Sequence, residues 1–382
     1  MKLAYSSWDE REFAAIQRVL ESGNFSMGTE VSNFESQFAD YFGAKYAVMA
    51  NSGSSANLLM VASLFFVKDN PLGPGDEVIV PAVSWSTTYF PLQQYGLKLV
   101  FVDVDLNTLN YDIESLSRAI NKSTRLVVAV NLLGNPNEFS AIAPLIDKHD
   151  IRLIEDNCES MGAMYANQYA GTFGVMGSFS TYFSHHISTM EGGLVITDSE
   201  ELFHIMLSLR AHGWTRNLPD HNYVTGSKSE NDFEESFKFV LPGYNLRPIE
   251  FMGAVGSAQL EKLPNIIKLR RQNAEYFQEI MGNQTRILIQ REIGKSSWFG
   301  FSLVVKPDSG LTREDLRKGL IALGIENRPI VAGNFTKNSV CKYFNYEIKG
   351  KLVNADLIDS SGLFIGNNGS DLKKWIRGLK KL

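Results

Sequence analysis

Short apolar segments alternate with helical ones through the first half of the chain. Residues 45–50, 77–80, 99–104, 125–130 and 152–155 read as buried strands, and 57–67, 113–120 and 141–149 have helical spacing of apolar residues. Strands separated by helices run parallel, because each crossover helix returns the chain to the same edge of the sheet. The pattern therefore predicts an α/β fold with a mostly parallel sheet flanked by helices.

A second region begins after this alternating part. Residues 248–280 form one long helical segment, and residues 284–382 have a shorter α+β pattern. A chain of 382 residues usually forms two domains. We therefore predict a large domain of residues 1–255 and a smaller C-terminal α+β domain of residues 256–382. The polar stretch 217–235 is predicted to be a surface loop, and long loops often border sites.

The composition argues against several classes of partner. The net charge of −5 disfavours nucleic-acid binding, and the longest apolar run, residues 58–67, is shorter than the roughly 20 residues of a membrane span. Two cysteines, Cys158 and Cys341, exclude a disulfide scaffold. The first residues show no apolar signal segment, so we expect a cytoplasmic protein with neither nucleic acid nor membrane as a partner.

Small residues follow the first predicted strand. Ser52, Gly53 and Ser54 lie between that strand and a helix, where free backbone N–H groups and the helix dipole favour an anion such as phosphate. An ordinary turn with a serine helix cap is the alternative. Trp85 follows the strand 77–80, at the sheet edge where α/β proteins bind ligands. It is suited to stack on a flat ring, or equally to fill a core.

Acidic residues end the strand 152–155. Asp156 at this place can pair with a protonated pyridine nitrogen and keep the ring cationic, which makes the ring an electron sink. A helix cap is the alternative for Asp156 alone. Together with Ser180, Trp85 and the serine–glycine turn, Asp156 predicts a pyridoxal phosphate site.

These residues resemble the sugar aminotransferase family named for DegT, DnrJ, EryC1 and StrS, a branch of the aspartate aminotransferase fold (fold type I). The resemblance covers nearly the whole chain and includes Glu191-Gly192-Gly193, His212-Gly213 and the segment 243–248. It implies that Asn245 reaches the cofactor phosphate of a partner subunit, in a homodimer with shared active sites. The cofactor-binding residues that it implies are Gly53, Ser54, Trp85, Asp156, Glu159, Ser180 and Asn245.

The chain departs from this family at the reactive centre. The family's Schiff-base lysine lies five residues after the serine, where this chain has His185, and no lysine occurs between Lys148 and Lys228. Pyridoxal or pyridoxamine 5′-phosphate is therefore expected to bind non-covalently. An imidazole can still move protons, so His185 is the predicted catalytic residue. The family's glutamine near the cofactor phenol is Glu159 here.

Family members with a histidine at this position are sugar 3-dehydratases. The resemblance therefore implies a lyase that removes the C3 hydroxyl of a nucleotide-linked 4-keto-6-deoxy sugar. L-glutamate regenerates the amine form of the cofactor, and ammonia is released. Two cysteines are too few for an iron–sulfur cluster, which one subgroup carries. The other subgroup acts on GDP-4-keto-6-deoxy-D-mannose in colitose and O-antigen biosynthesis, and this chain resembles it.

Three residues are candidates for the glutamate carboxylates. Arg216 and Arg247 offer the forked donors that suit carboxylates, and His212 is expected beside them. Structural ion pairs are the alternative for both arginines. In the small domain, Glu326 is the candidate for reading guanine, because a carboxylate can accept from the adjacent N1–H and N2 amine. A surface acid is its alternative.

Other functions remain open at this point. The chain could be a nucleotide-sugar aminotransferase, or a catalytically inactive homologue that binds pyridoxal phosphate. A metal pair of His185 and His186 is disfavoured, because adjacent residues on a strand point to opposite faces and no third ligand is evident. We therefore expect no metal.

Overall fold

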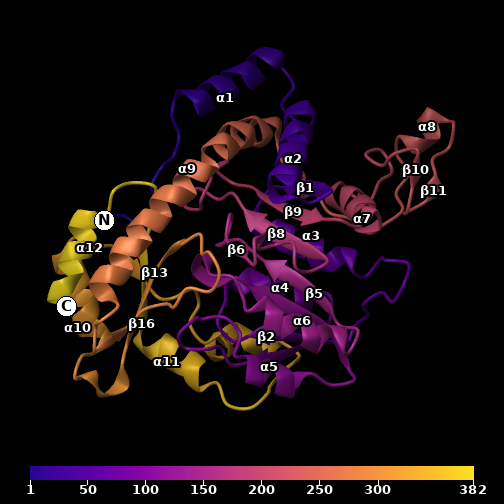
Figure 1. Ribbon diagram of the computed structural model, residues 1–382. Helices are drawn as coiled ribbons and strands as arrows, with labels where there is room; N and C mark the ends of the chain where they lie inside the picture. The colour runs from indigo at the N-terminus through magenta and orange to yellow at the C-terminus, as the bar shows by residue number, and fades with distance from the viewer.

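The computed structural model describes residues 1–382, and an eight-stranded sheet forms its centre (Figure 1). The strand order is β1-β9-β8-β5-β4-β2-β3-β15. All neighbours from β8 to β15 pair in parallel, whereas β9 is antiparallel to both of its neighbours. The predicted mostly parallel sheet is thereby confirmed. The strands are β1 (Tyr46–Ala50), β2 (Glu77–Pro81), β3 (Lys98–Val102), β4 (Thr124–Val130), β5 (Arg152–Asp156), β8 (Met176–Ser180), β9 (Gly193–Thr197) and β15 (Tyr346–Ile348).

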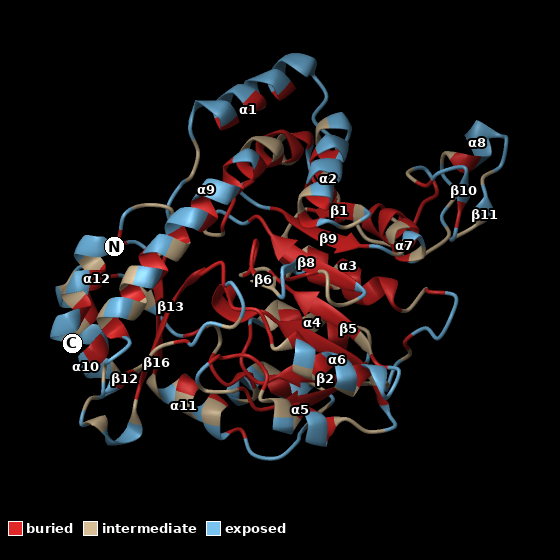
Figure 2. Ribbon diagram, in the orientation of Figure 1, coloured by how far each residue is buried: buried red, intermediate tan, exposed pale blue.

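Helices cover both faces of this sheet. Alternate strand residues point to opposite faces, so Val78 and Val80 pack with α3 and α4, whereas Ile79 packs with α5 and α6. Figure 2 shows the central strands buried on both sides. The helices are α1 (Glu10–Ser22), α2 (Thr29–Phe42), α3 (Gly53–Ser63), α4 (Ser86–Gln94), α5 (Ile113–Ala119), α6 (Phe139–Asp147), α7 (Glu200–Arg210), α9 (Glu250–Met281), α10 (Arg313–Ala322), α11 (Val353–Ser361) and α12 (Lys373–Gly378).

A second sheet and core lie in the C-terminal part. The antiparallel order is β12-β13-β16-β14, with α10 and α12 packed nearby. The helix α9 contributes to two cores, because Leu263 packs with α2 near the large sheet and Phe277 packs in the C-terminal core. The predicted boundary at 255 therefore falls inside α9, and the two-domain division remains a proposal. The strands are β12 (Ile287–Leu288), β13 (Gly300–Val305), β14 (Asn327–Arg328) and β16 (Gly362–Gly366).

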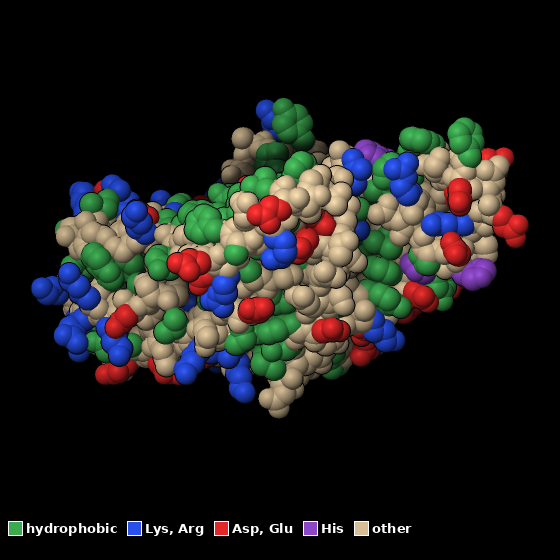
Figure 3. All heavy atoms as spheres, turned by 90° about the horizontal axis from the view of Figure 1, so that it is seen from above, with side chains coloured by type: hydrophobic (Ala, Val, Ile, Leu, Met, Phe, Trp, Pro, Cys, Tyr) green, Lys and Arg blue, Asp and Glu red, His purple; other side chains and the backbone are tan.

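The polar stretch 217–235 forms an arm rather than an unstructured loop. It contains β10 (His221–Asn222), β11 (Gly226–Ser227) and α8 (Asp232–Glu235), and it projects from the sheet beside α7 (Figure 1). Hydrophobic side chains lie on its surface among charged ones (Figure 3). Phe233 is 87% exposed and Phe237 is 68% exposed. No helix of the structure combines the length and the apolar character needed to cross a bilayer. The two short strands β6 (Met164–Tyr165) and β7 (Gln168–Tyr169) form a separate hairpin.

Candidate active site

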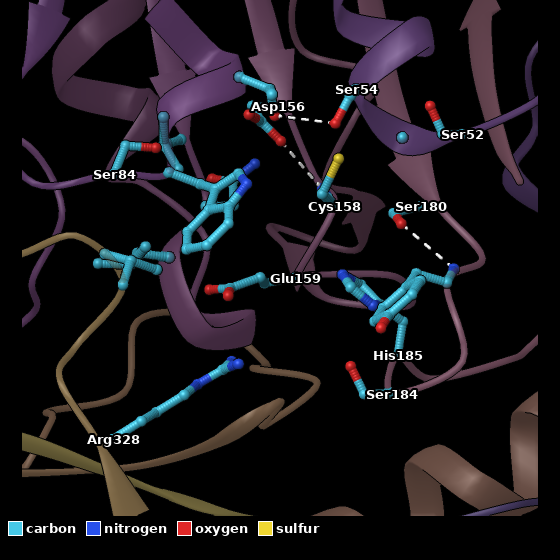
Figure 4. Close-up of a pocket in the computed structure, with 18 of the residues that line it drawn as sticks. Ser52, Ser54, Ser84, Asp156, Cys158, Glu159, Ser180, Ser184, His185 and Arg328 are labelled. Carbon is cyan, nitrogen blue, oxygen red and sulfur yellow. Dashed lines mark hydrogen bonds between the residues drawn. The ribbon is translucent and has the colours of Figure 1, made fainter. Parts of the chain in front are cut away.

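A cavity of about 600 Å³ opens at the carboxyl ends of the parallel strands. This is where open α/β sheets bind ligands. Segments that follow β1, β2, β4, β5 and β8 line it, and residues 328–331 of the C-terminal part close it (Figure 4). Of the predicted site residues it brings together Gly53, Ser54, Trp85, Asp156, Glu159, Ser180 and His185.

Asp156 ends β5 and is held by three donors. Its Oδ2 accepts hydrogen bonds from Asn57 Nδ2 at 2.9 Å and from Thr88 Oγ1 at 2.7 Å, and its Oδ1 accepts from the Cys158 N–H at 3.1 Å. Asp156 as a whole is only 6% exposed, yet it lines the cavity. These donors fix the position of the carboxylate. Asp156 can therefore face a cationic ring nitrogen.

The serine–glycine turn comes very close to β8. A Cβ on Gly53 would lie 2.6 Å from Ser180 Cβ and 2.8 Å from Ser180 Oγ, so only glycine fits here. Ser52 caps α3, and its side chain accepts the Ser55 N–H at 3.0 Å. The first N–H groups of α3 and the Ser54 and Ser180 hydroxyls thus converge on one side of the cavity, as in an anion cradle.

Trp85 and Glu159 stand on other walls of the cavity. Trp85 precedes α4 and is 56% exposed, so its ring is available to stack on a flat ligand. Glu159 Oε2 accepts the Leu133 N–H at 3.2 Å. Burial raises the pKa of Glu159 to about 7, although the nearby Arg328 opposes this shift. Glu159 is therefore able to change its protonation state near neutral pH.

His185 lies at the edge of the cavity, in the turn that follows Ser180 (Figure 4). Burial lowers its pKa to about 3, and the positive charges of Arg328 and Arg270 add to this shift. The imidazole is therefore neutral across the neutral pH range and is available to accept a proton. Its Nδ1 is buried and has no protein partner.

The expectation that His185 and His186 lie on a strand is wrong. The strand β8 ends at Ser180, and both histidines lie in the turn that follows, because the chain leaves the sheet there. The two side chains are nevertheless separated. His186 is 1% exposed, its Nε2 lies 3.1 Å from the Ser297 carbonyl oxygen, and it does not line the cavity. No group of three potential metal ligands occurs in the structure.

Arg328 is a cavity residue that the sequence did not single out. It belongs to the two-residue strand β14, and its guanidinium lies 4.7 Å from the centre of the Phe364 ring. The predicted guanine reader, Glu326, lies two residues earlier but outside the cavity lining. It borders a neighbouring hollow, where its Oε2 accepts the Leu3 N–H at 2.9 Å. Arg328 has no signal in the sequence, since a two-residue strand leaves no periodicity.

The four remaining predicted residues gather around Trp214, away from the cavity lining. The guanidinium carbon of Arg216 lies 4.3 Å from the Trp214 ring centre, and that of Arg247 lies 5.4 Å from it. The His212 ring is 5.2 Å from the same ring, and Arg247 Nε donates to Asn245 Oδ1 at 3.0 Å. We call this group the Trp214 cluster. Within a single chain, the Trp214 cluster therefore does not line the cofactor cavity.

Comparisons with known proteins identify the family. The DegT/DnrJ/EryC1/StrS aminotransferase family matches residues 6–366. The chain belongs to this family. It is 58% identical over 378 residues to the GDP-4-keto-6-deoxy-D-mannose 3-dehydratase of Yersinia pseudotuberculosis. The matched residues cover 99% of this chain and 96% of that relative.

Two solved structures of GDP-4-keto-6-deoxymannose-3-dehydratase extend this likeness. One contains a trapped PLP–glutamate geminal diamine, with a TM-score of 0.98, 57% identity and coverage of 100% of this chain and 99% of that chain. The other is a histidine-to-asparagine mutant with bound GDP-perosamine, with a TM-score of 0.98, 58% identity and coverage of 99% and 98%. The fold of this chain is therefore the aspartate aminotransferase-like fold type I, and pyridoxal phosphate is its cofactor.

The cavity residues fit this cofactor. The fixed carboxylate of Asp156 suits the pyridine nitrogen, and the close approach of Gly53 to Ser180 leaves a cradle that a Cβ would fill. Trp85 offers an exposed ring on another wall of the same cavity. No lysine lines the cavity, so the protein offers no amine for a covalent link there.

Proposed function

We propose that this family member is a 3-dehydratase of GDP-4-keto-6-deoxy-D-mannose that uses L-glutamate to regenerate the amine form of its cofactor. The observation that carries the proposal is the pairing of an intact cofactor cradle with His185, and no lysine, at the reactive edge of the cavity. The identity of 58–59% to two dehydratases of this name supports the same substrate.

The cofactor, held non-covalently by Asp156, Trp85 and the cradle, supplies an amine and an electron sink. The chain's own residues then handle the protons. With ligands bound, the neutral His185 imidazole would accept a proton from a reacting carbon atom, and as an imidazolium it would donate that proton to the departing hydroxyl or to a neighbouring carbon. The carboxylate of Asp156, which three donors hold in place, lies at the opposite end of the site.

The overall reaction balances with glutamate as the reductant. The C3 carbon of the keto sugar exchanges a hydroxyl for a hydrogen and gains two electrons. Glutamate supplies both electrons and becomes 2-oxoglutarate, and its nitrogen is released as ammonia. The product is a GDP-linked 3,6-dideoxy-4-keto sugar. One of the relatives is a Salmonella typhimurium lipopolysaccharide biosynthesis protein, 33% identical over 368 residues, which fits the use of such a sugar in a surface polysaccharide.

The active unit in this proposal is a homodimer with shared active sites. The Trp214 cluster lies outside its own chain's cavity, and Arg216 and Asn245 are exposed. Phe233 in the arm and Phe237 just after it are exposed aromatics that a second subunit would cover. In the dimer Asn245 meets the partner's cofactor phosphate, and Arg216 and Arg247, with His212, bind the carboxylates of glutamate.

The nucleotide and the location complete the proposal. Glu326 is still the proposed reader of guanine, since its hollow adjoins the segment that carries Arg328 into the cavity. A cytoplasmic location fits the two free cysteines, Cys158 and Cys341, because thiols remain reduced there.

An assay of the purified protein tests the reaction. GDP-4-keto-6-deoxy-D-mannose, pyridoxal phosphate and glutamate are incubated together, and mass spectrometry follows the sugar while a coupled assay follows ammonia. We expect a sugar lighter by one oxygen atom, with ammonia and 2-oxoglutarate in equal amounts. Formation of an amino sugar without ammonia would instead identify an aminotransferase, and no turnover would identify an inactive homologue.

The cofactor linkage gives a second, independent test. Borohydride treatment of the cofactor-loaded protein should leave no pyridoxyl adduct on any peptide, because no lysine lines the cavity. A pyridoxyl-lysine in the peptide that contains His185 would overturn the assignment.

A further inference from the structure

The Trp214 cluster contains an asparagine whose side-chain amide can take only one orientation. Arg247 Nε donates a hydrogen bond to the Asn245 side chain at 3.0 Å. A guanidinium has five N–H donors and no acceptor, so it can face only the oxygen of an amide. Asn245 Oδ1 therefore points to Arg247, and the Nδ2 amine points the other way. Asn245 is exposed, and no group of the same chain accepts a hydrogen bond from Nδ2.

The backbone around Asn245 is held by hydrogen bonds on both sides. The Tyr244 N–H donates to the Leu209 carbonyl oxygen at 2.7 Å. The Leu246 N–H donates to the Arg210 carbonyl oxygen at 2.9 Å. The position of the Asn245 backbone is thus fixed by the end of α7, and only the side chain needs a further contact to be ordered.

The guanidinium that supplies this contact is itself restrained. Its carbon lies 5.4 Å from the centre of the Trp214 ring, within the range of a cation–π contact. Trp214 is only 8% exposed, and its Nε1 donates to Asn217 Oδ1 at 3.1 Å. The ring is therefore a fixed surface, and it limits the rotation of the guanidinium of Arg247.

We propose that Arg247 is a positioning residue, which turns the Asn245 amide so that its amine faces the cofactor phosphate of the partner subunit. The inference rests on the shared active sites of the proposed function. A phosphate dianion only accepts hydrogen bonds, so the Nδ2 amine attracts it and an amide oxygen would repel it. Arg247 uses Nε for this purpose, and its two Nη atoms remain for a carboxylate of glutamate.

Two neighbouring arginines give a variant and its matched control. Arg247→Met removes the donor to Asn245 and keeps an unbranched apolar stem beside Trp214, and Arg247→Leu replaces it if the methionine protein does not fold. Arg216→Met is the control. The guanidinium carbon of Arg216 lies 4.3 Å from the centre of the same ring, but Arg216 Nη2 donates to the Ser236 carbonyl oxygen at 2.8 Å and not to Asn245.

The first experiment compares pyridoxal phosphate with pyridoxal, which lacks the phosphate, by absorbance titration of the cofactor-free proteins. Ordering one released side chain on binding weakens affinity roughly 2- to 12-fold. We expect the Kd for pyridoxal phosphate to rise by this factor in Arg247→Met and to stay unchanged in Arg216→Met. The Kd for pyridoxal should be the same in all three proteins. An equal loss for both ligands in Arg247→Met would indicate a general structural effect and overturn the proposal, as would an unchanged Kd for pyridoxal phosphate.

The second experiment repeats the titration in an Asn245→Ala background. Asn245→Ala alone should raise the Kd for pyridoxal phosphate about 10- to 140-fold, because a hydrogen bond to a charged group is lost. Adding Arg247→Met should then change nothing, since Arg247 acts on the phosphate only through Asn245. A further rise in the double variant would mean that Arg247 acts directly, and the positioning role would be wrong. If Asn245→Ala alone left the Kd unchanged, the contact between subunits in the proposed function would fail, and the positioning role would fail with it.

Discussion

At the Asp156 end of the cofactor cavity both carboxylate oxygens accept hydrogen bonds from protein groups, whereas at the other end His185 Nδ1 has no protein partner. The two acid–base groups of the reactive end also have shifted pKa values. Burial raises the pKa of Glu159 to about 7 and lowers that of His185 to about 3. The binding end is thus built before any ligand arrives, and the reactive end keeps groups that can gain or lose a proton.

His185→Asn should have the largest effect of any single change in the cavity. Asparagine keeps some hydrogen bonding but cannot exchange protons near neutral pH. Because positioned acid–base catalysis contributes about 10²–10⁴-fold, glutamate-dependent amine formation and sugar dehydration should each fall at least about a hundredfold. Single-turnover absorbance measures the first rate and mass spectrometry the second. Cofactor binding should remain, and its loss would mean that the two ends are not separable.

Gly53→Ala tests the phosphate cradle at the binding end of the cavity. The new Cβ would lie 2.6 Å from Ser180 Cβ, and such overpacking costs about 1–3 kcal/mol. The Kd for pyridoxal phosphate should therefore rise roughly 5- to 140-fold, as measured by absorbance titration. Gly73→Ala is the control, because a Cβ there meets nothing within 4 Å. Unchanged affinity in Gly53→Ala would place the phosphate elsewhere.

Glu159→Gln tests the raised pKa of Glu159 through the pH dependence of the free energy of unfolding. Because the pKa of Glu159 is raised to about 7 in the folded protein, the native state binds the proton more tightly than the unfolded state. This tighter proton binding stabilises the folded protein fully below the ordinary glutamate pKa, and the stabilisation is lost as the pH rises to about 7. Wild type should therefore lose about 1–3 kcal/mol relative to Glu159→Gln between about pH 5 and pH 8. Urea denaturation of the cofactor-free proteins measures this difference, and parallel pH curves would contradict it.

Glu326→Gln asks whether the reactive end extends to the nucleotide. Glutamine cannot accept from both the N1–H and the N2 amine of guanine, so the preference for GDP over CDP should fall about tenfold in calorimetric titration. The substitution Glu314→Gln on exposed α10 is the control. If GDP binds no better than CDP even in wild type, guanine is not read here.

His186→Asn should have the smallest effect on proton transfer. His186 is buried outside the cofactor cavity and faces the Ser297 carbonyl, so its loss should lower stability more than the chemical rates. The rates are compared with those of His185→Asn under the same conditions. Equal or reversed effects of the two substitutions would mean that the wrong histidine has been assigned.

Sequence patterns predicted the binding end better than the reactive end. Asp156 ends β5, and Gly53 and Trp85 come a few residues after β1 and β2. Parallel strands bring their carboxyl ends to one edge, so order along the chain predicted proximity in space. Arg328 comes from a two-residue strand of the C-terminal part, and only tertiary packing carries it over the cavity.

Two further features depend on packing that no periodicity records. The position of the two histidines depends on where β8 ends, and a strand boundary is the least predictable feature of a sequence. The Trp214 cluster was predicted as a set of ligand-binding residues, but its distance from the cavity follows from the path of the chain after α7. Motifs therefore nominated these residues as candidates without saying which of them one subunit brings together.

The helix α9 makes catalysis and folding depend on one element. Its first half packs Leu263 against α2, its second half packs Phe277 into the C-terminal core, and Arg270 lies between them beside His185. Neither core can unfold without releasing one half of α9 from its packing. Loss of the C-terminal core therefore withdraws Arg270 from the His185 backbone carbonyl. Heat inactivation should then coincide with global unfolding instead of preceding it as a local event.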